Sequence, residues 1–262
     1  MMNKIDYLIT GGCSFSQLQH ADITWPIHLE KYLSPNVAIH TGKASAGNRT
    51  ISRLVLLEIF KALEEGVDPR DMFVAVMWSG VNRHDVYTTD ADFPHTEILR
   101  DPETHHYTPL MLNCDERNLY LLNAHWEDLS SKMYYENFYD ELGSYIATLE
   151  HVLRVQWFLQ SLGINYFMTE YSFDCIHQTQ WHTVDGIPHN PPPNYSEHPD
   201  ANILFSMVDW NQWLPVKNMS HWVESHKIPY SRPGDFHPST EAHTRFTNEI
   251  IIPHMQNLGH VE

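Results

Sequence analysis

Cysteine is scarce in this sequence, with 3 residues among 262. Cys13, Cys114 and Cys175 are too few and too scattered for a disulfide framework or a CxxC metal site, which indicates reduced thiols. Long apolar runs are also missing. No stretch approaches the roughly 18 residues that a membrane span requires, and no signal peptide opens the chain. These absences predict a soluble protein, cytoplasmic or associated with a virion, without a membrane partner.

Basic residues are few as well. The 16 lysines and arginines face 33 acidic residues, and the formal net charge is −17 at pH 7. Such a charge argues against a nucleic-acid backbone or an anionic membrane surface as partner, and it favours neutral or sugar-like ligands. The 42% of hydrophobic and 19% of charged residues are typical of a globular chain, so we expect a single domain over residues 1–262.

Histidine is abundant, with 19 residues, but its spacing does not suit a metal ion. The histidines are spread over the whole chain, and the adjacent His105 and His106 cannot form the pair four residues apart that binds zinc from one helical face. The sequence therefore predicts no metal site and no other cofactor. A histidine-rich metal protein stays an alternative hypothesis.

The stretch IDYLITGGCSFS, residues 5–16, combines an apolar run with a small-residue turn. The run stops at Gly11 and Gly12, and Ser14 follows two positions later. This pattern predicts a buried strand that ends in a tight turn presenting Ser14. Glycine at such a turn permits positive φ angles and lets other backbone come close.

Further apolar runs alternate with helical patterns along the chain, which is typical of an α/β fold with a parallel sheet. We expect a three-layer α/β/α arrangement whose sheet has about five mostly parallel strands. Two long loop insertions are predicted at about 84–131 and 171–225, and Trp210 and Trp213 within the second suit helix packing better than sugar binding. Strands are expected at 37–41, 72–78, 164–169 and, as a remnant, 228–230. Helices are expected after Thr24, from Asn48 as N-cap, over 134–162 up to Gly163, and after Ser239 or Thr240.

Polar residues follow the predicted strands at the points where those strands end. Ser14 follows the first strand, Gly47 the second and Asn82 the third, while Asp235 and His237 precede the last helix. The carboxyl ends of parallel strands meet at one edge of a sheet, where ligands collect. We therefore expect these residues to gather into a site that holds a nucleophile, a base, an acid and hydrogen-bond donors.

The short stretches that carry these residues resemble the sequence blocks of the SGNH hydrolases, the GDSL-type esterases. GGCSFS resembles the first block, SAGN at 45–48 the second, SGVNR at 79–83 the third and GDFHPS at 234–239 the last. The resemblance implies a flavodoxin-like fold and a serine esterase, often one that removes O-acetyl groups from carbohydrate.

The same resemblance implies a role for each site residue. Ser14 would be the nucleophile, His237 the general base and Asp235 its orienting acid, with Ser14, Gly47 and Asn82 as oxyanion donors. One departure concerns Cys13, which stands where the family usually has aspartate. Cys13 is also an alternative nucleophile, but adjacent residues leaving a strand point to opposite sides, which favours Ser14.

Two functions therefore remain open beside the metal protein. The first is a hydrolase acting on a small-molecule or carbohydrate ester. The second is a catalytically inactive SGNH fold that serves as a binding or structural module, for instance in a phage particle. The oligomeric state is not predicted by any feature of the sequence.

Overall fold

The computed structural model describes residues 5–17, 23–88, 112–114, 117–123, 129–172, 176, 198–232 and 234–261. Much of both predicted insertions, including His105, His106 and Cys175, lies outside these residues.

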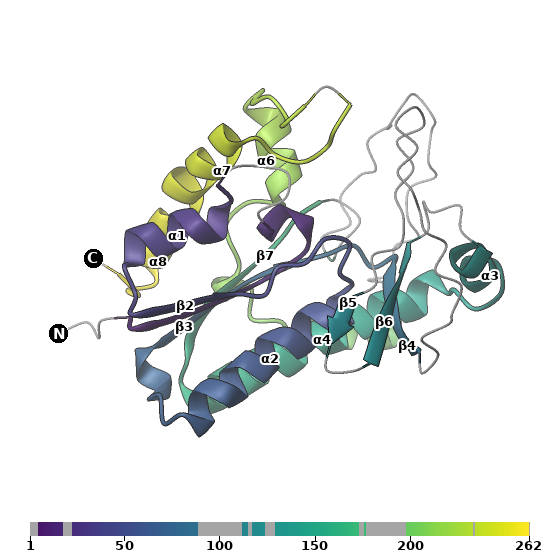
Figure 1. Cartoon of the computed structure of the whole chain (residues 1–262), viewed down its shortest axis with the longest axis horizontal. Helices are drawn as coiled ribbons and strands as arrows, with labels where there is room; N and C mark the ends of the chain where they lie inside the picture. The colour runs from purple at the N-terminus through teal and green to yellow at the C-terminus, as the bar shows by residue number, and fades with distance from the viewer. Residues whose placement is uncertain are drawn as a thin grey trace.

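A parallel sheet forms the centre of the fold (Figure 1). Its four strands lie in the order β2-β1-β3-β7, and every neighbouring pair is parallel. The apolar run MFVAVMW forms β3, whose residues are all buried, as expected for a central parallel strand covered on both faces. The strand bounds are β1 (Tyr7–Gly11), β2 (Val37–His40), β3 (Met72–Trp78) and β7 (Asn165–Glu170).

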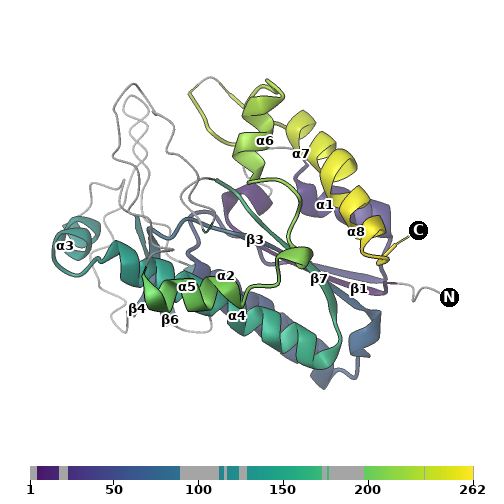
Figure 2. The same ribbon diagram turned by 180° about the vertical axis from the view of Figure 1, so that it is seen from behind.

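Helices cover both faces of this sheet, which confirms the predicted α/β/α layers (Figures 1 and 2). One face carries α2 (Asn48–Glu64), α4 (Glu141–Leu162) and α5 (Pro199–Ser206). The other carries α1 (Trp25–Leu33), α6 (Met219–Ser225), α7 (Thr240–Phe246) and α8 (Ile252–Asn257). A π-helical turn, η5 (Thr247–Ile251), joins α7 to α8.

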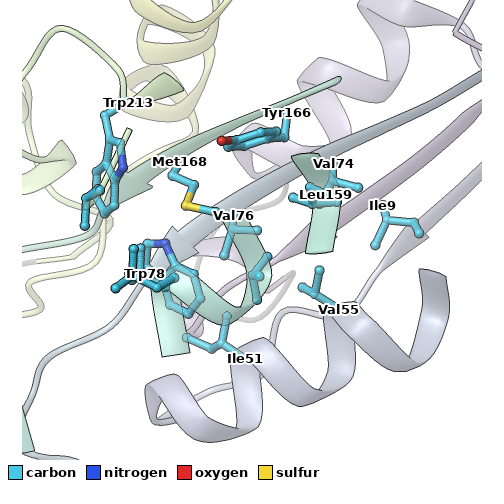
Figure 3. Close-up of a cluster of buried hydrophobic side chains, with 14 of the residues drawn as sticks. Ile9, Ile51, Val55, Val74, Val76, Trp78, Leu159, Tyr166, Met168 and Trp213 are labelled. Atoms are coloured by element: carbon cyan, nitrogen blue, oxygen red, sulfur yellow. The ribbon is translucent and has the colours of Figure 1, made fainter. Parts of the chain in front are cut away.

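The two hydrophobic cores follow from the alternation of side chains along β3. Val74, Val76 and Trp78 pack toward α2 and α4, where Figure 3 shows them with Ile51 and Val55. The intervening Phe73, Ala75 and Met77 belong to the core under α1, α6 and α7. Replacing Phe73, Met77 or Trp78 by alanine would cost about 2–5 kcal/mol of stability.

The predicted fifth strand is wrong. Tyr230 forms only an isolated antiparallel bridge with Pro238, so the parallel sheet has four strands among the described residues. The three apolar positions at 228–230 are too few to pair along a neighbour, and Ile228 instead packs in the core beneath the helices. The predicted helix over 134–162 is also divided, because Asp140 accepts a hydrogen bond from the Gly143 amide and starts a new helix, α4.

The first predicted insertion contains regular structure rather than loop alone. It holds a second, antiparallel sheet in the order β4-β6-β5 and a helix beside it. The first strand of this sheet contains the sequence HDVYT. Its polar residues leave no apolar run, so the sequence did not predict a strand there. The bounds are β4 (Arg83–Thr88), β5 (Leu112–Cys114), β6 (Arg117–Asn123) and α3 (Leu129–Asn137).

The tryptophans of the second insertion serve packing, as predicted, although in a short turn of 3-10 helix, η4 (Trp210–Gln212), rather than a longer helix. Trp213 is buried, and its ring lies 5.1 Å from that of Trp210. Trp213 also bridges to Met168 of β7. This segment therefore extends the core of the sheet.

Candidate active site

The candidate site lies at the carboxyl edge of the parallel sheet. The chain passes from β1 to β2 on one side and from β3 to β7 on the other, so the order reverses between β1 and β3. Such a reversal opens a crevice between the loops that follow the two strands. Ser14 follows β1 and Asn82 follows β3, so both residues stand at this reversal.

Ser14 opens a turn of 3-10 helix, η1 (Ser14–Ser16), that leaves β1 through two glycines. A Cβ atom on Gly12 would lie 2.1 Å from Ser16 Oγ, and one on Gly11 would lie 2.4 Å from Val55 Cγ2. Neither glycine has a positive φ angle. Both glycines are needed for close packing, as predicted, but the predicted positive φ angles are wrong for these two residues.

Three side chains form a contact series, in which His237 lies between Ser14 and Asp235 and touches both. His237 Nε2 is 2.9 Å from Ser14 Oγ, and His237 Nδ1 is 2.5 Å from Asp235 Oδ1. Asp235 Oδ1 also accepts a hydrogen bond of 3.0 Å from the His237 amide, and Ser231 donates its hydroxyl to Asp235 Oδ2 at 3.1 Å. Each carboxylate oxygen thus has a donor, which fixes the carboxylate relative to the imidazole.

The protonation states of the pair suit proton transfer from Ser14. Burial lowers the pKa of His237, and the charges of Arg83 and Arg232 add to this effect, while Asp235 opposes it. Burial alone would raise the pKa of Asp235, but hydrogen bonds from His237 and Ser231 bring it below its usual value. At neutral pH a neutral imidazole therefore lies beside an ionised carboxylate.

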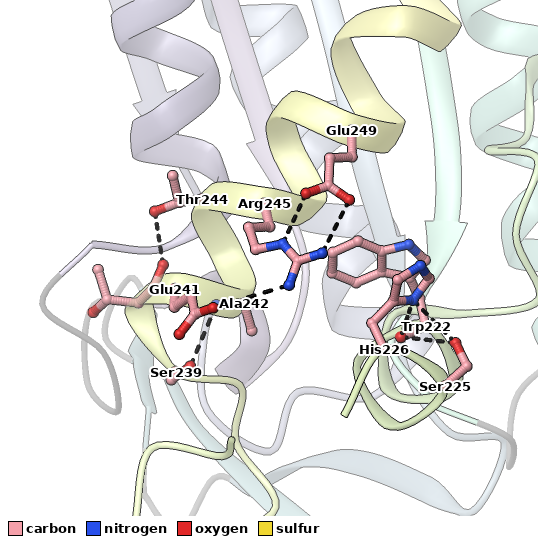
Figure 4. Close-up of polar contacts among 10 residues, drawn as sticks. Trp222, Ser225, His226, Ser239, Glu241, Ala242, Thr244, Arg245 and Glu249 are labelled. Atoms are coloured by element: carbon pink, nitrogen blue, oxygen red, sulfur yellow. Dashed lines mark hydrogen bonds and ion pairs between the residues drawn. The ribbon is translucent and has the colours of Figure 1, made fainter. Parts of the chain in front are cut away.

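The loop that carries Asp235 and His237 is held at both ends. The Ser231 amide donates to the His237 carbonyl at 2.9 Å, and Gly234 adopts a positive φ of 77° where the loop turns. Helix α7 begins directly afterwards, and the Ser239 hydroxyl caps it by accepting from the Ala242 amide (Figure 4). These contacts fix the loop directly before α7 and thereby position the His237 imidazole.

The predicted oxyanion donors lie at the same edge of the sheet. The Ser14 amide opens η1, where no earlier turn supplies it with a helical acceptor. Gly47 is the N-cap of α2, and a Cβ there would lie 2.4 Å from the Arg83 carbonyl oxygen, so only glycine lets these loops approach so closely. Asn82 Oδ1 is buried and has no hydrogen-bond partner among the described residues. That the three donors converge on one point stays a prediction.

Asn48 has another role than the predicted helix cap. The helix begins one residue earlier than expected, with Gly47 as N-cap. The buried Asn48 side chain instead accepts from the Ser79 amide at 2.7 Å and donates to the Ser79 carbonyl at 2.9 Å. It thereby ties the start of α2 to the end of β3, which fixes the loop that carries Asn82.

Three residues around the site escaped the sequence analysis. The Phe15 ring lies 5.5 Å from that of His237 and 4.9 Å from that of Tyr171, which follows β7. Arg83 donates to the Tyr171 hydroxyl at 3.0 Å. Position after a strand end, the signal that selected Asn82, would also have selected Tyr171 and Arg83.

Cys13 lies away from this contact series. Its side chain is fully buried in the apolar core with Phe15 and Trp25, which argues against Cys13 as the nucleophile. Within the described ranges no group of three or more His, Cys, Asp and Glu side chains could hold a metal ion. The same part of the chain holds no helix that is both long enough and apolar enough to cross a membrane.

Fold and contacts together define a three-layer α/β protein with a serine–histidine–aspartate series at the carboxyl edge of its sheet. Residues 14–182 match the model of a family of unknown function (DUF6071), and the chain belongs to this family. The matched range includes Ser14, Gly47 and Asn82 but ends before Asp235 and His237. No curated protein and no solved structure matches the chain.

Proposed function

We propose that this protein is a serine hydrolase of the SGNH type that cleaves acyl esters, with O-acetylated carbohydrate as the substrate class. The observation that carries the proposal is the His237 imidazole, which touches Ser14 Oγ through one nitrogen and Asp235 through the other. A serine hydroxyl is a weak nucleophile by itself, and this arrangement supplies the base and the orienting acid that activate it.

In the proposed reaction, Ser14 Oγ attacks the ester carbonyl while His237 Nε2 takes the hydroxyl proton. His237 then returns this proton to the departing alcohol, which leaves an acyl group on Ser14. Water gives a proton to the same nitrogen as its oxygen attacks the acyl carbonyl. His237 passes this proton to Ser14 Oγ when the bond between Ser14 and the acyl group breaks, which releases the carboxylic acid and restores the serine hydroxyl. Asp235 stays ionised throughout and stabilises the imidazolium that forms in each half of the reaction.

The oxyanion that develops on the carbonyl needs donors at a fixed place. The amides of Ser14 and Gly47 and the side chain of Asn82 would serve this role. Removing one such donor typically costs on the order of 3 kcal/mol of transition-state stabilisation. Residue 13 takes no chemical step in this mechanism. In the SGNH family the aspartate at this place helps to order the site, so cysteine there bears on catalytic efficiency rather than on the fold.

An exposed aromatic ring beside the contact series supports a carbohydrate alcohol. Phe236 stands between Asp235 and His237 and is 58% exposed. With Tyr230, whose ring lies 6.3 Å away, it lines a surface groove of about 400 Å³ next to Asp235. Such rings offer a flat apolar face on which the C–H face of a sugar can pack.

A fluorophosphonate probe tests the proposal, because it phosphonylates only activated serines. Intact mass should rise by one phosphonyl group in the native protein and in the Cys13→Ala variant. The Ser14→Ala variant should stay unlabelled. A pure protein that has the circular dichroism of an α/β fold but never reacts would overturn the hydrolase and favour the inactive binding or structural module.

A further inference from the structure

An apolar groove crosses the outer surface of one helical layer. Helices α2, α4 and α5 lie side by side on the same face of the parallel sheet (Figures 1 and 2). On their outer side they form a groove of about 760 Å³. Its apolar lining includes Leu56 and Phe60 of α2, Trp157 and Phe158 of α4, and Leu204 of α5. The residues that line this groove include none of the candidate active site.

Large apolar side chains are exposed in this groove and beside it. Phe60 and Trp157 are each 50% exposed, and Ile203 of α5 is 53% exposed. Phe60 packs on Phe158, whose ring lies 4.9 Å away. Aromatic side chains are enriched at the centres of protein interfaces, and tryptophan is prominent among the residues that dominate binding energy. The surface therefore has the composition of an interface core.

The size of this surface suits a stable protein complex. With 17 residues at a rise of about 1.5 Å each, α2 is about 25 Å long, and α4 is longer. Three helices packed about 8–10 Å apart span a similar width. The resulting area of roughly 600 Å² in flat projection approaches the roughly 800 Å² of accessible surface that each partner buries in a stable interface.

Two charged residues in the groove indicate which partner fits. Glu150 and Arg154 lie one turn apart on α4, and both line the groove. Arg154 donates to Ser52 Oγ and, at 3.2 Å, to His151 Nδ1. Within the described part of the chain, neither Glu150 nor Arg154 forms an ion pair. A second α4 lying antiparallel would place Arg154 opposite Glu150 twice, because a two-fold axis exchanges the two positions.

The same axis matches side chains by size. Trp157 lies three positions after Arg154, and Ala147 lies three positions before Glu150, so all four residues share one stripe of the helix. A two-fold axis that pairs Glu150 with Arg154 therefore also pairs Trp157 with Ala147. The small alanine leaves room for the exposed indole ring. Charge and size thus make this stripe of α4 complementary to itself.

We propose that the groove is the interface of a homodimer, in which α4 packs antiparallel to α4 of a second copy and Glu150 of each copy pairs with Arg154 of the other. This inference does not depend on the proposed hydrolase function. Each copy has a formal net charge of −17, so the apolar contacts have to outweigh a general repulsion. At about 150 mM salt this repulsion is screened beyond about 8 Å.

Analytical ultracentrifugation of the native protein at this salt concentration tests the dimer. Over about 1 to 100 µM protein, a range that brackets dissociation constants typical of modest dimers, the mass should rise from 30.6 kDa to twice that value. The Trp157→Glu variant should stay monomeric over the same range. A native protein that is monomeric at every concentration would overturn the proposal and leave the groove to a different partner.

Charge reversal tests the arrangement of the two helices. Glu150→Arg and Arg154→Glu should each raise the dissociation constant at least about tenfold, because like charges then face each other across the axis. An equimolar mixture of the two variants should dimerise again, since every pair in the mixed dimer has opposite charges. Lys31→Glu is the matched control, because Lys31 is exposed on α1 on the other face of the sheet, and it should leave the dimer unchanged.

The outcomes distinguish the dimer from a structural effect of the substitutions. Circular dichroism checks that each variant is folded. If Arg154→Glu does not fold, since it loses the hydrogen bond to Ser52, the result for Glu150→Arg and Trp157→Glu decides. Dimers that persist in both of these variants would overturn the proposed interface. Folded charge variants that stay monomeric in the mixture would overturn the antiparallel pairing.

Discussion

The imidazole Nε2 of His237 lies 2.9 Å from Ser14 Oγ, although 223 positions separate the two residues in the sequence. The sheet accounts for this contact, because Ser14 leaves its strand β1 at the same edge that the loop before α7 reaches. The contact gives the base a direct path to the hydroxyl proton. Several measurable consequences follow if the site is a hydrolase.

Removing the side chain of Asn82 should slow the chemical step. We expect Asn82→Ala to lower kcat on 4-nitrophenyl acetate by about 10²- to 10³-fold with little change in KM, because the amide would bind the oxyanion rather than the substrate carbonyl. Asn36→Ala is a suitable control, since Asn36 is exposed and pairs with Asp6 at the amino edge of the sheet. Equal rates in the Asn82 variant and the native protein would contradict its role as a donor.

The pH dependence of kcat/KM should follow the His237 imidazole. This group must be neutral to accept the Ser14 proton, and burial lowers its pKa below 6.5. The rate should therefore be constant near neutral pH and fall as the pH drops through a single midpoint below 6.5. Stopped assays over a range of buffers at constant ionic strength measure this midpoint.

The Arg83→Gln variant provides a control for this profile. Asp235 raises the pKa of His237, whereas Arg83 and Arg232 lower it. Removing the charge of Arg83 should therefore move the midpoint to higher pH, toward 6.5. A midpoint that stays in place, or moves down, would show that the titrating group is not His237.

Buried histidines should make the fold sensitive to mild acid. Burial lowers the pKa of His243 to about 3, and the neighbouring His28 and His237 contribute to this shift. Below pH 6.5 the unfolded chain binds a proton at this position that the folded chain does not. The free energy of unfolding should therefore fall by about 1.4 kcal/mol per histidine of this kind between pH 7.5 and pH 5.5.

Urea titrations at the two pH values measure this loss. His243 accepts a hydrogen bond from the Trp25 amide, so His243→Gln should be less stable than the native protein at pH 7.5. Its loss between pH 7.5 and 5.5 should nevertheless be smaller by about 1.4 kcal/mol, because the titrating group is gone. An unchanged loss in this variant would contradict the assignment to His243.

The sequence predicts those parts of the fold that local patterns determine. The run from Met72 to Trp78 is apolar at every position, so its place at the centre of the sheet could be predicted without knowing its neighbours. Gly163 ends α4 in the left-handed conformation, as its position after the helical pattern indicates. The positions of Ser14, Asp235 and His237 could be predicted because each follows or precedes such an element.

Features that depend on distant contacts could not be predicted in this way. Strand β4 is rich in polar residues and pairs with β6, whose residues lie 30 to 40 positions further along the chain, so the pattern of β4 alone does not identify it as a strand. Asn48 satisfies the rules for a helix cap, yet its side chain pairs with the Ser79 backbone at the end of β3, which is distant in the sequence. Arg83 contacts Tyr171, which lies at the end of another strand.

The loop between Ser231 and His237 has one more consequence, which concerns synthesis on the ribosome. Ser14 is made before strands β2, β3 and β7, but His237 follows all of these strands. A nascent chain that already contains the folded β1, β2 and β3 would still lack the imidazole. Under the proposed function, a growing polypeptide therefore gains esterase activity only after residue 237 has been made and has joined the folded sheet.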